Sequence, residues 1–231
     1  MPLKPLISLF ALALPLTAVA QEQAHEPSEE NAEQSQFVGR YDGSSMETAM
    51  GMVVRPDGSF QWGLSVGSLD LRAKGTWYEQ GGMIAFTSDP KPVAPEFVWS
   101  GIEETGDGPF LRINWAGTED PFTYADVRGL CANGDLINTA LSKGVWSPDE
   151  SCDKVVAIEF YLSSYQVLSA PFELVGERKV NERQTIQIEF HRNDLGLADF
   201  DGVTGVLQEG KLRLESSLGA MTLRKLPPPA E

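Results

Sequence analysis

The fold class is decided by the stretch RPDGSFQWGLSVGSLDLRAKGTWYEQGG, residues 55–82. Apolar and polar side chains alternate along it, as in strands that bury one face. The sequences PDG, VGS and QGG separate the runs, and tight turns favour these residue types. The stretch therefore predicts two antiparallel strands, residues 59–66 and 69–79, joined by a short turn.

The same period of two recurs along the remaining chain, and no long segment has the helical period of 3.6 residues. We therefore predict an all-β protein. The segment SDPKPVAPEF contains three prolines, which suit a domain crossing or a sheet edge better than a central strand. Further strands are expected at residues 37–42, 46–55, 83–87, 97–103, 110–115, 122–130, 155–163, 172–175 and 185–191, with shorter strands near the end of the chain.

The sequences at the two ends of the chain predict a signal peptide for export and disordered segments. Residues 1–20 combine one lysine, an apolar run and small residues before Gln21, which is typical of a signal peptide cleaved after Ala20. We therefore expect a periplasmic protein with no membrane span. Residues 21–36 hold five glutamates and no bulky apolar side chain, so we expect a disordered acidic leader, and a disordered tail at residues 227–231.

The net charge limits the possible binding partners, and the cysteine content predicts a disulfide. The formal net charge of −15 opposes binding to nucleic acid or to an anionic lipid surface. The two cysteines, Cys131 and Cys152, form an even number in a chain expected to be exported. They predict a disulfide that closes a loop of about 20 residues.

Four stretches of the chain resemble the strand meander of small lipocalin-like barrels, such as the N-terminal barrel of NlpE-type copper-stress envelope lipoproteins. The chain also resembles exported alphaproteobacterial proteins that share its TSDP and DLG-x-x-DF-x-G segments. In those proteins a barrel precedes a sandwich of the carboxypeptidase-regulatory-like or transthyretin-like kind, for which residues 110–146 are the matching segment. The lipidated cysteine and the C-x-x-C pair of NlpE-type barrels are absent, so copper sensing and membrane anchoring do not follow. The four stretches are FVGRYDGS, MGMVVRPDGSFQW, KGTWYEQGGMIAFTSDP and EGKLRLESSLGAMTLRK.

The resemblance implies a small antiparallel lipocalin-like barrel plus a β-sandwich, and two arrangements fit. In the first, residues 37–94 and 193–226 form the barrel and residues 95–192 form an inserted sandwich. In the second, two β domains follow in tandem and divide near Arg128. We favour the insertion, because returning strands would close the exposed edges of an incomplete meander.

Histidine content limits catalytic chemistry. His25 lies in the acidic leader, so a nucleophile–histidine pair or a mixed zinc site would have to use His191. No G-x-S-x-G sequence is present. We therefore expect no enzyme and no cofactor, and a binding or envelope-interaction module instead.

Acidic residues leave an enzymatic alternative open. Asp194, Asp199 and Asp201 form the densest acidic cluster. They would suit a calcium site or a carboxylate-based hydrolase of envelope saccharide or peptide, while aspartates before glycine are also ordinary turn residues.

Two further hypotheses concern ligands of the barrel. Met46, Met50 and Met52 share one strand parity, so their thioethers would either hold Cu(I) or fill the core. If the barrel is hollow, we expect a small apolar ligand to contact four side chains; otherwise the partner would be an envelope protein. The four are Met50, Trp62, Leu64 and Trp77.

Overall fold

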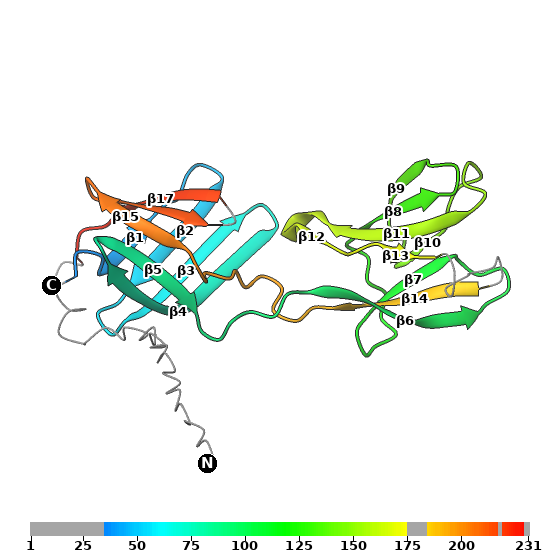
Figure 1. Cartoon of the computed structure of the whole chain (residues 1–231), viewed down its shortest axis with the longest axis horizontal. Helices are drawn as coiled ribbons and strands as arrows, with labels where there is room; N and C mark the ends of the chain where they lie inside the picture. Colours follow the sequence, from blue (N-terminus) through cyan, green and yellow to red (C-terminus); the bar gives the residue numbers. More distant parts are fainter. Residues whose placement is uncertain (1–34, 175–183, 217–218, 229–231) are drawn as a thin grey trace, which may run out of the picture.

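The computed structural model describes residues 35–174, 184–216 and 219–228 (Figure 1). The predicted signal peptide, nearly all of the predicted leader and residues 229–231 of the predicted tail lie outside these ranges. The described residues form β-strands and one 3-10 turn, η1 (Ser163–Tyr165), so the all-β prediction is confirmed.

Eight strands form a closed barrel in which every pairing is antiparallel. The first five form a meander along the chain, and the last three come from its other end. β15 pairs with β5 and β17 pairs with β1, so the late strands close the barrel. The predicted barrel is therefore present. Its strands are β1 (Gly39–Asp42), β2 (Thr48–Val54), β3 (Ser59–Val66), β4 (Leu69–Gln80), β5 (Met83–Ser88), β15 (Thr204–Gln208), β16 (Lys211–Ser216) and β17 (Gly219–Lys225).

The G-x-W sequence of the opening stretch lies on β4 and marks a close approach of two strands. A Cβ atom on Gly75 would collide with the carbonyl oxygen of Thr87, and the φ of +157° also favours glycine. Trp77 is buried and its Nε1 donates a hydrogen bond to the carbonyl oxygen of Arg55 at 2.8 Å. Both residues thus serve the packing of the barrel.

Two further sheets form a β-sandwich between β5 and β15 in the sequence. Their strand orders are β10-β7-β14-β6 and β12-β11-β8-β9, with β13 also paired to β11. β7 and β14 are parallel and the other pairs are antiparallel. The strands are β6 (Glu96–Glu104), β7 (Leu111–Trp115), β8 (Asp126–Cys131), β9 (Leu136–Ala140), β10 (Val145–Trp146), β11 (Val155–Leu162), β12 (Val167–Leu168), β13 (Phe172–Glu173) and β14 (Gln184–His191).

The sandwich has an aromatic core of its own. Phe122 stacks on Phe190 with ring centroids 4.3 Å apart, and Phe97 contacts Phe160 at 4.9 Å. The predicted strand 122–130 is wrong in its first half, because the side chain of Phe122 enters this core in a segment that precedes the ladder of β8. Strands β9, β10 and β12 were not predicted.

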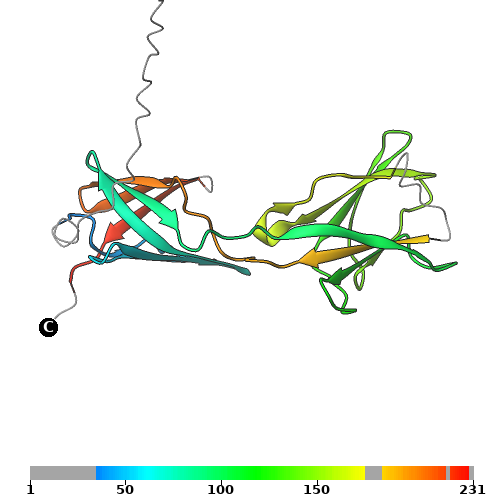
Figure 2. The ribbon, with the colours of Figure 1, turned by 60° about the horizontal axis from the view of Figure 1, so that its bottom comes forward.

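Barrel and sandwich lie at opposite ends of an elongated molecule, joined by two chain crossings that run side by side (Figures 1 and 2). The returning crossing forms backbone hydrogen bonds with β4. Arg72 N–H donates to the carbonyl oxygen of Gly196 at 2.9 Å. Ala198 N–H donates to the carbonyl oxygen of Arg72 at 2.8 Å. The insertion therefore enters and leaves the barrel at one place.

Candidate functional site

The barrel interior is filled by aromatic side chains. Phe200, on the segment before β15, is 0% exposed. Its ring centroid lies 5.3 Å from that of Phe60, 5.1 Å from Trp62 and 6.0 Å from Phe86. These rings occupy the space that a ligand of a hollow barrel would need.

The four predicted ligand-contacting residues are all core or core-flanking residues of the barrel. Trp62 and Trp77 are 4% and 3% exposed, while Met50 and Leu64 are half-buried and pair across β2 and β3. Trp62 Nε1 has no hydrogen-bond partner among the described residues. The structure brings Met50, Leu64 and Trp62 to neighbouring positions of one face, and their role toward a ligand stays a prediction.

The prediction that three methionines share a face is wrong. Met46 is 99% exposed, whereas Met52 is buried. β2 begins only at Thr48, and Ser45 N–H donates to the carbonyl oxygen of Thr48 at 2.8 Å. Met46 therefore lies at the tip of a hairpin turn, where strand parity does not apply.

The disulfide between Cys131 and Cys152 is confirmed, with the two Cα atoms 5.6 Å apart. Both residues are buried. The bond ties the end of β8 to the segment before β11, so it stabilises the sandwich.

Asp201 holds the junction between the barrel and the outgoing crossing. Ser88 N–H donates to one carboxylate oxygen at 2.9 Å, and Lys91 Nζ donates to the other at 2.9 Å. Lys91 also lies 3.5 Å from Asp199. The hydrogen bond from Lys91, together with that from Ser88, lowers the pKa of Asp201, and the same contact raises the pKa of Lys91.

Asp194 joins the two crossings to each other. Its carboxylate accepts a hydrogen bond from Val93 N–H at 2.9 Å, and its own N–H donates to the carbonyl oxygen of Val93 at 3.1 Å. Asn193 Nδ2 donates to the carbonyl oxygen of Ala94 at 2.8 Å. Within the described ranges no group of three or more acidic, histidine or cysteine residues is arranged to hold a metal ion. These aspartates act as linker residues.

His191 forms no nucleophile–histidine pair in the described chain. Its Nε2 lies 3.3 Å from the carboxylate of Glu189, and no serine or cysteine side chain is hydrogen-bonded to it. Nothing in the described residues points positively to an enzymatic activity.

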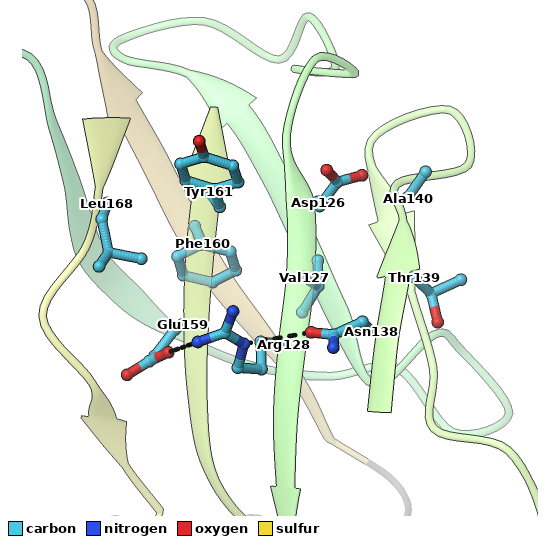
Figure 3. Close-up of a pocket in the computed structure, with 10 residues that line it drawn as sticks. All are labelled: Asp126, Val127, Arg128, Asn138, Thr139, Ala140, Glu159, Phe160, Tyr161 and Leu168. Atoms are coloured by element: carbon cyan, nitrogen blue, oxygen red, sulfur yellow. Dashed lines mark hydrogen bonds and ion pairs between the residues drawn. The ribbon is translucent and has the colours of Figure 1, made fainter. Parts of the chain in front are cut away.

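The outer face of the second sandwich sheet carries a groove of about 240 Å³ with polar and apolar lining residues (Figure 3). It crosses β9, β8 and β11 and reaches β12. Ten residues line it: Asp126, Val127, Arg128, Asn138, Thr139, Ala140, Glu159, Phe160, Tyr161 and Leu168.

Arg128 is the centre of this groove, because cross-strand register sets Asn138 on one side of it and Glu159 on the other. Arg128 Nε donates to Asn138 Oδ1 at 3.2 Å and Nη1 donates to Glu159 Oε2 at 3.3 Å. The guanidinium is thus fixed in place with donors left over.

An apolar rim lies beside this polar row. Tyr161 pairs with Leu168 across β11 and β12, and both side chains are exposed. Asp126 faces Tyr161 from β8. Sequence reasoning missed the groove because its residues are contributed by four strands, and only the strand register brings them together.

No protein-family model, curated protein or solved structure matches this chain. The described residues include no helix long and apolar enough to cross a membrane.

Proposed function

We propose that this protein is an exported, non-catalytic binding module and that the groove around Arg128 recognises a saccharide. The observation that carries the proposal is the row Asn138, Arg128 and Glu159, whose side chains are held across three strands on an exposed sheet face. A fixed row of this kind favours binding, because its geometry is established before a ligand arrives.

The groove offers the groups that a sugar ring requires. Sugar hydroxyls donate and accept hydrogen bonds, and the groove supplies donors from Arg128 and Asn138 and acceptors from Glu159 and Asp126. The exposed ring of Tyr161 offers an amphipathic surface on which the C–H face of a sugar can pack. A site with few polar groups beside an apolar surface is typical of small-molecule recognition.

The contacts of the acidic residues support binding better than hydrolysis. Asp194 and Asp201 are engaged in holding the two crossings. Glu159 is paired with Arg128. Of the two carboxylates that line the groove, Glu159 is held by Arg128 and only Asp126 is left, whereas a hydrolase would use two carboxylates that flank the scissile bond.

The test is a binding titration of the purified protein with soluble envelope-type saccharides by calorimetry. Tyr161→Ala and Glu159→Gln should each weaken binding at least about tenfold, since each removes one class of contact. Tyr124→Ala is the matched control, because Tyr124 is 67% exposed on the same domain but does not line the groove. Saccharide binding that survives both groove variants, or no binding by the unmodified protein, would reject the proposal.

Carriage of a small apolar ligand is a second candidate, favoured by an open pocket of about 420 Å³ on the barrel that Met50 and Leu64 help to line. A fluorescent apolar probe bound there should lose affinity when Leu64 is changed to Ser. Absence of any probe uptake by the unmodified protein would dismiss this candidate.

A further inference from the structure

The free edges of the sandwich differ in how well they are protected against pairing with another strand. β6 carries Glu96, Glu103 and Glu104, and charged side chains discourage edge pairing. β10, β12 and β13 are two residues long. β9, with the sequence LINTA, has five residues, no charge and no proline, and it ends its sheet at the rim seen in Figure 1.

The backbone of β9 presents a regular set of free hydrogen-bonding groups. Cys131 N–H donates to the carbonyl oxygen of Asp135 at 2.9 Å, and Leu141 N–H donates to that of Ala125 at 3.2 Å. Because bonded and non-bonded pairs alternate in an antiparallel ladder, the odd-numbered residues of β9 bond to β8. The backbone groups of Leu136, Asn138 and Ala140 therefore point away from the sheet.

We propose that β9 is a self-association edge, which pairs antiparallel with β9 of a second copy about a twofold axis at Asn138. In this register Asn138 faces the partner's Asn138, and Leu136 faces the partner's Ala140. Each of the three outward-facing residues of one copy then lies opposite an outward-facing residue of the other copy. Each such pair exchanges two backbone hydrogen bonds. The match follows from the even spacing of the free groups about Asn138.

Exposed apolar surface favours a second copy in this orientation. Leu136 is 60% exposed and pairs with Leu130, which is 36% exposed. Antiparallel pairing sets Ala140 of the other copy against Leu136 at both ends of the pair. The net charge of −15 repels two copies elsewhere, and salt screens this repulsion. A single strand edge is a small interface, so the dimer is weak and strengthens with ionic strength.

Sedimentation velocity of the full purified chain, from micromolar to millimolar concentration and at low and high salt, tests this dimer. The weight-average mass should rise from one chain toward two, more so at high salt. Asn138→Asp should stay at the mass of one chain, because it sets two carboxylates face to face across the axis while each still pairs with Arg128 of its own chain. Ala140→Pro should also stay at the mass of one chain, because it removes an outward-pointing N–H group and keeps the backbone hydrogen bonds to β8.

Gln166→Glu is the matched control, because it adds the same charge at an exposed position outside β9. It should associate as the unmodified protein does. Circular dichroism establishes that each variant is folded. The proposal is overturned if the unmodified protein is monomeric at millimolar concentration in high salt, or if Asn138→Asp dimerises as strongly as the unmodified protein.

Discussion

Replacing Phe200 with alanine should cause the barrel to unfold at a much lower concentration of denaturant. The ring is fully buried and lies against Phe60, Trp62 and Phe86. Burial losses plus an unfilled cavity cost about 3–5 kcal/mol for a Phe→Ala change in a core. A closed ring of eight paired strands cannot collapse easily onto the space, so we expect about 4 kcal/mol or more. That corresponds to about a thousandfold change in the unfolding equilibrium of the barrel.

Urea unfolding measures this effect, with tryptophan fluorescence and far-ultraviolet circular dichroism as probes. The barrel and the sandwich have separate cores, so two transitions are expected and each needs its own fit. Phe172→Ala is the control, because Phe172 is half-buried against the sandwich core and should shift the other transition. A loss below about 1 kcal/mol for Phe200→Ala would refute a filled, rigid barrel.

Three other predictions concern the barrel strands, the sandwich and the crossing. Gly75→Ala should cost the barrel about 1–3 kcal/mol through backbone strain and a strand collision, measured as a fall in melting temperature; an unchanged value would contradict the close approach at β4. Replacing Cys131 and Cys152 with serine should destabilise the sandwich by about 3 kcal/mol while leaving the barrel transition in place; equal shifts of both transitions would show that the bond acts globally. Because the pKa of Asp201 is lowered in the folded state, its bond to Lys91 stabilises the protein above the ordinary aspartate pKa of 3.8. This contribution is lost as pH falls through the lowered pKa, so the stability difference from Asp201→Asn should vanish in acid and be constant near neutral pH; a difference that grows in acid would reverse the assignment.

Much of the barrel could be predicted from the sequence because its signals are local. Residues 59–66 were predicted with the bounds of β3, since a PDG turn and a VGS turn delimit an alternating run. The burial of Trp62 and Trp77 follows from the same parity and is confirmed. The prediction from strand parity is wrong at Met46, because the chain turns there before the strand begins.

The sandwich was less predictable because short strands carry little periodicity. The sequence LINTA places two apolar residues side by side and then polar ones, so β9 gives no alternating signal. It forms a strand because the tight turn after Cys131 returns the chain along β8. The sequence left the acidic cluster open between turn residues, a calcium site and hydrolase carboxylates, and the bonds of Asp194 and Asp201 to distant partners depend on the tertiary fold.

The groove could not be found from the sequence at all. Arg128, Asn138 and Glu159 come from three strands. Their alignment depends on strand register, including an irregularity between Val155 and Ala157 on β11. Register of this kind is fixed by packing and turn geometry rather than by a local motif.

Mapping of amide chemical shifts during saccharide titration tests the central claim most directly. If the sandwich face is the binding surface and the barrel is a filled scaffold, the shifts that move should belong to Arg128, Asn138, Glu159 and Tyr161. The signals of the barrel core around Trp62 should stay in place. Shifts confined to the barrel, or none with any saccharide, would contradict the account.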